Sequence, residues 1–223
     1  MIRRLQLSFF ATLLMLVVAA PSQAAIKITE AMSSSGSGGT DDWIELTNTG
    51  GSAVDITGYK MDDGSFNAAN SVLLLGVTSI AAGQSVVFLE TSDPGTDIPA
   101  FRAFWDGANA LSGVTIGSYS GSGLSFSGSG DGVIIFDSLN ANAIIDQVSF
   151  GAATSGVTFG FDPNTLTFGG LSVAGQFGAF NSFDTTPLNV GSPGAVPEPS
   201  TLVMAGMSLV GAALVALRRR LQK

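Results

Sequence analysis

Short apolar runs separated by glycine-rich turns constrain the fold of this chain more than any other feature. The runs "AIKIT", "DWIELTN", "QSVVFLE" and "DGVIIFDS" have the length of strands. In the first two, apolar residues alternate: Ile26 and Ile28 share one face, and Ile44 and Leu46 lie opposite Trp43. With 29 glycines for turns, this pattern predicts an all-β fold, an antiparallel two-sheet β-sandwich.

Further elements follow from the same reasoning. "VDITGYKMDD" predicts a third strand, "SVLLLG" a core strand, and "DGVIIFDS" with "NAIIDQVSF" a hairpin. "IPAFRAFWDG" favours a short helix, because Phe101, Phe104 and Trp105 have helical spacing. Residues 151–189 are rich in Gly and Phe and give no clear prediction.

Two residue types are absent. Without cysteine the chain has no disulfides and no thiol chemistry, and without histidine it lacks the commonest general base and the commonest zinc ligand. A Ser-His-Asp site is therefore excluded.

Charge is distributed unevenly. Between Ala25 and Val196 only Lys27, Lys60 and Arg102 stand against 16 acids, a formal net charge of −13. A surface this acidic repels phosphates, so we expect no nucleic acid partner.

The amino terminus has the features of a signal peptide. Arg3 and Arg4 precede an apolar stretch, Pro21 ends it, and small residues follow. We predict a signal peptide over residues 1–24, cut between Ala24 and Ala25 by signal peptidase after export through the secretion machinery.

The carboxyl terminus has the features of a membrane anchor. Residues 201–217 are uncharged and mostly apolar, which predicts one C-terminal transmembrane helix. Arg218, Arg219 and Arg220 follow as a basic stop that stays in the cytoplasm. The body is then anchored in the inner membrane and faces the periplasm.

The stretch before this span carries a resemblance. "VPEPST", an apolar helix and an Arg cluster occur in that order over residues 196–223, which resembles the PEP-CTERM sorting tail. The resemblance implies recognition of Pro197, Glu198 and Pro199 by exosortase, a membrane-embedded protease-transpeptidase.

The body carries a second resemblance. "DDWIELTNTGGSAVDITGYKMDD", "IAAGQSVVFLE", "SGSGDGVIIFDSLNANAIIDQVSF" and "TTPLNVGSPGA" together resemble the lamin-tail domain. This implies an immunoglobulin-like β-sandwich over residues 25–195. In this reading Asn48 caps a turn, and Gly58 and Gly83 supply backbone angles that other residues resist.

Possible sites in the body are acidic or aromatic. Asp41 and Asp42 precede one strand and Asp62 and Asp63 end another, so they could ligate calcium, but solvated acidic loops explain them better. No other cofactor is expected.

Enzyme chemistry needs a carboxylate pair in this chain. Glu45 and Glu90 are the candidates, although such residues more often face water, and Trp43 and Trp105 are the aromatics to test for saccharide stacking. The leading hypothesis is a non-enzymatic protein of the cell envelope or extracellular matrix, structural or adhesive in an exopolysaccharide biofilm. The alternative is a secreted carboxylate-dependent hydrolase or calcium-binding module acting on polysaccharide.

Overall fold

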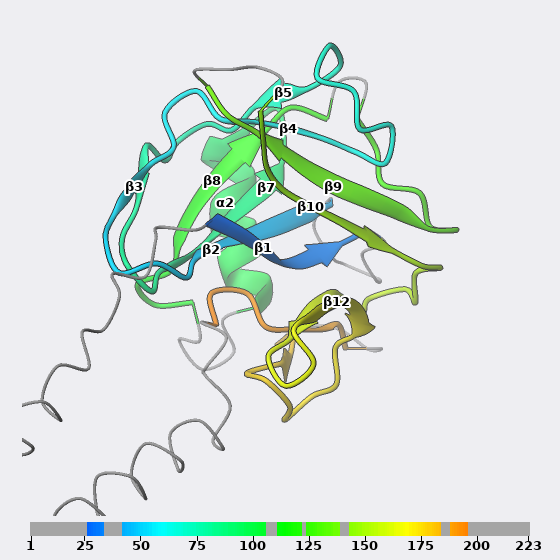
Figure 1. Cartoon of the computed structure of the whole chain (residues 1–223). Helices are drawn as coiled ribbons and strands as arrows, with labels where there is room; N and C mark the ends of the chain where they lie inside the picture. Colours follow the sequence, from blue (N-terminus) through cyan, green and yellow to red (C-terminus); the bar gives the residue numbers. More distant parts are fainter. Residues whose placement is uncertain are drawn as a thin grey trace, which may run out of the picture.

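Two β-sheets packed face to face form the body of the protein (Figure 1). The computed structural model describes residues 26–33, 42–105, 111–121, 124–138, 143–183 and 188–195. Its elements, in chain order, are β1 (Ile26–Met32), β2 (Trp43–Asn48), β3 (Val54–Asp55), β4 (Lys60–Asp62), β5 (Val72–Leu73), β6 (Ser79–Ile80), β7 (Ser85–Glu90), α2 (Pro94–Trp105), β8 (Thr115–Tyr119), β9 (Asp131–Phe136), β10 (Ile144–Phe150), β11 (Phe159–Asp162), β12 (Thr167–Leu171), β13 (Phe180–Asn181) and β14 (Val190–Gly191).

The main core lies between the two sheets. One sheet has the order β12-β11-β1-β2-β7-β8 and the other β10-β9-β4-β5. The predicted alternation in β2 is confirmed: Ile44 and Leu46 belong to this core, whereas Trp43 points to the other face. The described part of the chain is mostly β with one short helix, consistent with the expected sandwich. Buried members of the core come from both sheets: Ile28, Ile44, Leu46, Val86, Phe88, Met61, Val133 and Ile135.

A second core covers the outer face of the larger sheet. There Trp43, Val87 and Leu89 pack against Phe101 and Trp105 of helix α2. The predicted helix is confirmed and begins earlier than expected, at Pro94, since Pro suits the first helical position.

Helix α2 also corrects the expectation of a purely antiparallel sandwich. Strand β8 pairs parallel to β7. Parallel neighbours need a long crossover connection, and α2 provides it. The other pairings between named strands in the described residues are antiparallel, including the predicted β9–β10 hairpin.

Two predicted strands are wrong in extent. "VDITGYKMDD" is not one strand but two, β3 and β4, which pair with β6 and β9 respectively. Gly58, at φ +80°, turns the chain between them. "SVLLLG" forms only the two-residue β5 at a sheet edge, so Leu74 is buried while Leu73 and Leu75 are exposed.

The Gly- and Phe-rich stretch continues the larger sheet. Strands β11 and β12 add to the free edge of β1, and the chain then returns through β13 and β14. Phe150 and Phe159 stack with ring centroids 4.7 Å apart and tie this addition to the main core. The added strands and loops lie together below β1 in Figure 1, in yellow and orange.

The segments predicted to enter a membrane lie outside the described residues. In the part of the chain that the structure describes, α2 is too short and too polar to cross a bilayer, and no other helix there qualifies. The predicted signal peptide with Ala24 and Ala25, and the tail with residues 197–199, 201–217 and 218–220, lie outside the described residues.

Candidate functional site

Two buried glutamates hold residues 189–195, near the end of the described chain. Glu30 Oε1 accepts a hydrogen bond from the backbone N–H of Ser192 at 2.6 Å. Glu45 Oε2 accepts one from the N–H of Gly194, also at 2.6 Å. Glu30 and Glu45 are hereafter the carboxylate pair. They fix the backbone immediately before the predicted sorting tail.

A β-bulge places both glutamates on the same face. In the β1–β2 ladder Ile28 pairs with Leu46 but Glu30 pairs with Glu45, so Thr29 is an extra residue. Simple alternation would point Glu30 into the core beside Ile28. The bulge turns Glu30 to the outer face of the sheet, directly opposite Glu45.

Burial perturbs both carboxyl groups. Desolvation raises the pKa of Glu30 from 4.5 to about 7, and hydrogen bonds from Thr158 and Ser192 oppose this rise. Desolvation also raises the pKa of Glu45, and the neighbouring charge of Glu30 adds to it. Glu30 Oε2 has no hydrogen-bond partner among the described residues, which adds to the cost of ionising it.

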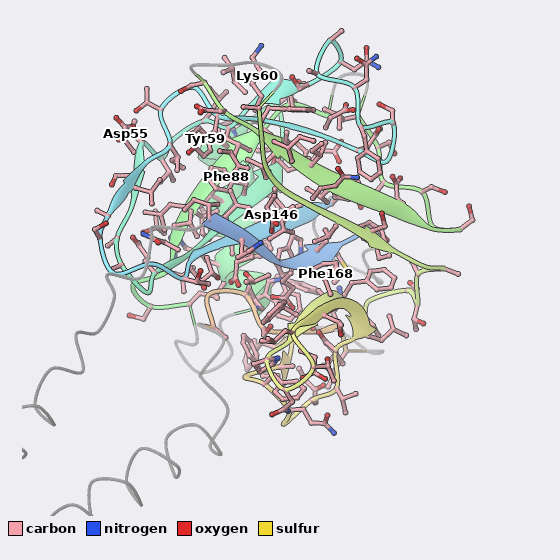
Figure 2. The ribbon with its side chains drawn as sticks, in the orientation of Figure 1. Asp55, Tyr59, Lys60, Phe88, Asp146 and Phe168 are labelled. Carbon is pink, nitrogen blue, oxygen red and sulfur yellow. The ribbon has the colours of Figure 1, made fainter. Side chains whose placement is uncertain are left out.

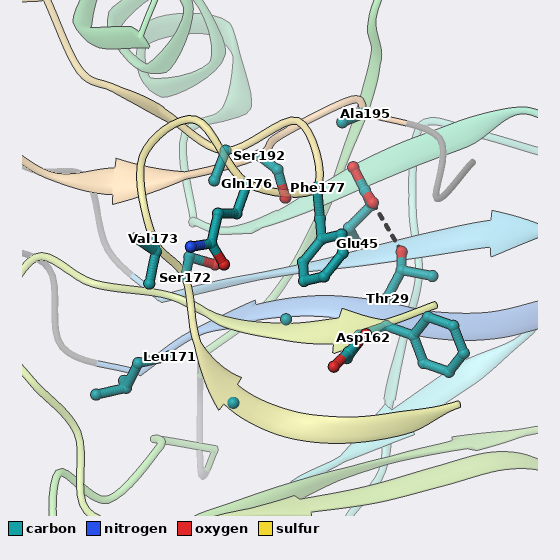
Figure 3. A pocket seen from close by; sticks show the side chains of 14 residues that line it. Thr29, Glu45, Asp162, Leu171, Ser172, Val173, Gln176, Phe177, Ser192 and Ala195 are labelled. Atoms are coloured by element: carbon teal, nitrogen blue, oxygen red, sulfur yellow. Dashed lines mark hydrogen bonds between the residues drawn. The ribbon is translucent and has the colours of Figure 1, made fainter. Parts of the chain in front are cut away.

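Hydroxyl groups connect the pair to the end of the described chain. Thr29 Oγ1 donates to Glu45 Oε1 at 2.7 Å, as Figure 3 shows, and lies 2.8 Å from Thr47 Oγ1. Thr47 Oγ1 lies 2.6 Å from Ser85 Oγ, which donates to the carbonyl of Ala195 at 3.1 Å. This network makes the backbone up to Ala195 part of the folded body.

Gly194 is required at its position. Its φ is +83°, and a Cβ there would collide with the side chain of Val114. The glycine therefore lets the backbone approach Glu45 closely.

A small cavity opens beside Glu45 (Figure 3). Its volume is about 220 Å³. Polar groups of Thr29, Ser172, Gln176 and Ser192 line it, and Phe177 stands at its side. Glu30 does not line this cavity, and the described oxygens of Glu45 already accept protein hydrogen bonds. The geometry therefore gives Glu45 a structural role: it holds the backbone at Gly194 in place.

A larger groove of about 920 Å³ lies between β1, β10 and the β11–β12 hairpin. Its walls are mostly apolar, with Phe168 among them. The Lys27–Asp146 ion pair, 2.9 Å long, connects β1 to β10 beside it. Asp146 also accepts the Ile28 N–H at 2.9 Å. Figure 2 labels Asp146 and Phe168, which both line this groove.

The acids considered for calcium serve loop hydrogen bonds. Asp42 accepts the N–H of Phe126, and Asp62 accepts the hydroxyl of Ser65 at 2.7 Å. Asp63 closes a turn onto the Ser65 N–H. Asp41 lies outside the described residues. Among those that the structure places, no three His, Cys, Asp or Glu residues gather as metal ligands, and the calcium site stays a prediction.

The glutamate pair considered for the enzyme alternative does not form. Glu45 is buried, contrary to the expectation that it faces water, because helix α2 and residues 189–195 cover that face. Glu45 pairs in register with Val87, three residues before Glu90. An odd offset along a strand puts Glu90 on the opposite face of the sheet.

The tryptophans are also unavailable for saccharide stacking. Trp43 and Trp105 are both buried, with ring centroids 6.1 Å apart in an edge-to-face arrangement. The turn roles were correct: Asn48 accepts the Gly50 N–H and donates to the carbonyls of Ser52 and Ile80.

Sequence reasoning missed Glu30. A signal existed in "IKITEAM", where an acid takes the inward position of an alternating strand. Such a conflict indicates either a bulge or a buried carboxyl group, and here both are present.

The fold and the site define a class: an all-β sandwich module whose last described backbone stretch is hydrogen-bonded into the body. The family model described as Lamin Tail Domain matches residues 19–152. The chain belongs to the lamin tail domain family. A second model, the PEP-CTERM protein-sorting motif, matches residues 195–220. This motif implies an exported, membrane-anchored protein that exosortase processes at the envelope.

Other comparisons add little. No protein with a curated description matches the chain. Among solved structures, a DUF4876 family protein from Bacteroides thetaiotaomicron is 12% identical, with a TM-score of 0.38, covering 78% of this chain and 72% of its own. Both matched families are structural or sorting modules rather than catalytic ones.

Proposed function

We propose that this chain is a non-enzymatic surface protein that serves a structural or adhesive role in an exopolysaccharide matrix. Its signal peptide, residues 1–24, directs export. Residues 201–217 then hold it in the inner membrane, with Arg218, Arg219 and Arg220 in the cytoplasm and the body in the periplasm. Exosortase cuts within residues 196–200, and the sandwich is released or transferred to the envelope or the matrix.

One observation carries this proposal. The sorting-motif match begins at residue 195, directly after Gly194, the last residue that donates a hydrogen bond to the carboxylate pair. Hydrogen bonds therefore hold the folded body up to Ala195, directly before the predicted cleavage segment of residues 196–200. Pro197 and Pro199 favour an extended backbone, which a protease can accept.

Fractionation of cells with and without exosortase tests the sorting step. The wild-type chain should shorten by about the mass of the tail and leave the inner membrane only when exosortase is present. Glu198→Gln should keep the full length. The matched control Asp63→Asn should be processed normally, because the amide oxygen can still accept the Ser65 N–H. Equal size and location of the wild-type chain in both strains would contradict the proposal.

Binding of the processed chain to matrix polysaccharide tests the molecular role. The larger groove is a surface to examine, since it combines apolar walls with the charged and amide groups of Lys27, Asp146 and Gln147. The processed chain should pellet with the isolated polysaccharide more than an unrelated acidic protein does. Equal pelleting of the two proteins would contradict an adhesive role.

The same preparation tests the hydrolase alternative. Release of reducing sugar that Glu45→Gln or Glu90→Gln abolishes, without lowering the melting temperature, would establish enzyme activity. A melting temperature that rises with added calcium would instead establish the calcium-binding module.

A further inference from the structure

Exposed apolar side chains gather at the exit of the sorting tail. Leu171, Val173 and Phe177 are 43%, 52% and 49% exposed, and all three line the small cavity together with Ala195. Figure 3 shows them around that cavity, with Ala195 at its edge. These three residues are hereafter the exit patch.

Direct contact fixes the patch beside the exit. A Cβ built at Gly178 would lie 2.8 Å from the Cβ of Ala195, so the loop that carries Phe177 touches the last described residue. Five residues, 196–200, separate Ala195 from the predicted span that begins at Thr201. A fully extended chain covers at most about 3.6 Å per residue, so the six steps from Ala195 to Thr201 can span at most about 22 Å.

The surrounding sequence is unusually free of charge. Between Gln147 and Ala195 the charged residues are Asp162, which lines the same cavity, and Asp184, with no Lys or Arg. The acids that would oppose contact with a lipid surface are concentrated in the earlier part of the chain. An uncharged patch carries little desolvation cost when it enters a membrane interface.

The backbone at Phe177 supports a displayed side chain. Its φ is +47°, a region that residues other than Gly, Asn and Asp seldom adopt. A glycine would suit this turn better, yet a large aromatic side chain stands there half-exposed. Backbone strain of this kind clusters at functional contacts, and Phe66 and Leu166 are the other described non-glycine residues with positive φ.

We propose that the exit patch inserts into the outer surface of the membrane that holds the sorting tail. The sandwich then rests on the bilayer in a fixed orientation and presents the cleavage segment at the membrane surface. Because the patch lacks cations, the contact does not depend on anionic lipid. This inference rests on the proposed anchoring by residues 201–217.

Lipid quenching of the full-length chain tests the contact. The chain is reconstituted in phosphatidylcholine vesicles with and without brominated acyl chains, which quench an indole that they touch. Phe177→Trp adds an indole to the exit patch. Leu73→Trp adds one at β5, an exposed leucine at the opposite end of the body in Figure 1. The parent chain gives the background from buried Trp43 and Trp105.

We expect brominated lipid to remove most of the emission that Phe177→Trp adds and none of that added by Leu73→Trp. Val173→Trp provides a second probe if Phe177→Trp lowers the melting temperature. Retained emission from both exit-patch probes, or equal quenching at Leu73, would overturn the inference. If, in the absence of lipid, the indole of an exit-patch probe becomes shielded from water as the protein concentration rises, the patch binds a second copy of the chain. That result would also overturn the inference.

Alkaline carbonate extraction separates the two proposals. If the chain resists extraction but the exit-patch probes are not quenched, the inference fails while the anchor stands. If carbonate removes the chain from the vesicles, the anchor and the inference fail together.

Discussion

The carboxylate pair makes a quantitative prediction about stability and pH. Burial raises the pKa of Glu30 from 4.5 to about 7. Between these values the folded protein binds more protons than the unfolded chain, so the free energy of unfolding falls as the pH rises. At about 1.4 kcal/mol per pKa unit, ionising Glu30 costs the folded state about 3 kcal/mol above pH 7, and nothing below pH 4.5.

Glu30→Gln should remove this cost. The amide oxygen can accept the same bonds from Thr158 Oγ1 and the Ser192 N–H, now 2.5 and 2.6 Å long. We expect the variant and the wild type to have similar stability at pH 4.5. At pH 8 the variant should gain about 3 kcal/mol, which corresponds to roughly 6–12 °C in melting temperature for a chain of this size.

The assay is thermal and urea unfolding of the full chain in detergent micelles, followed by the fluorescence of Trp43 and Trp105, which are both buried. Glu90→Gln, on the opposite face of the sheet, controls for the removal of one charge. If the difference between Glu30→Gln and wild type is the same at pH 4.5 and pH 8, Glu30 does not titrate in this range and the reasoning is refuted.

Four further substitutions test the fold. Asn48→Ala should lower the free energy of unfolding by about 3 kcal/mol, because it leaves buried turn groups unpaired; urea titration measures this loss. Gly83→Ala should cost about 1 kcal/mol from its positive φ alone, whereas Gly58→Ala should cost more, since its Cβ would lie 2.9 Å from that of Ser138; melting temperatures compare the two. Trp105→Ala should cost about 3–5 kcal/mol by emptying the core beneath α2, and equal stability of variant and wild type by calorimetry would contradict that packing.

Elements with a strong local pattern were predictable. The alternation of Ile44 and Leu46 against Trp43, the helical spacing of Phe101, Phe104 and Trp105, and the β9–β10 hairpin were all read correctly. The recognition of both families also came from local motifs, since their matched segments keep a fixed order along the chain.

Elements that depend on distant partners were not predictable. "SVLLLG" has the composition of a core strand, but it lies at an edge and leaves Leu73 exposed. Glu45 and Glu90 look equivalent in the sequence, yet the parity of the β2–β7 register places them on opposite faces. No local signal reveals that residues 189–195 cover Glu45.

The sequence alone determined the class of fold and the sorting motif, and it excluded histidine and cysteine chemistry. These follow from composition and from the spacing of neighbouring residues, which act over one strand or one helix. Only the tertiary structure decided that Glu30 lies opposite Glu45 and that both accept hydrogen bonds from the backbone just before the predicted tail. That outcome depends on a single extra residue in β1 and on a contact between positions 162 residues apart, Glu30 and Ser192. Such a contact exists only once the chain has folded, because no interaction between neighbours in the sequence specifies it.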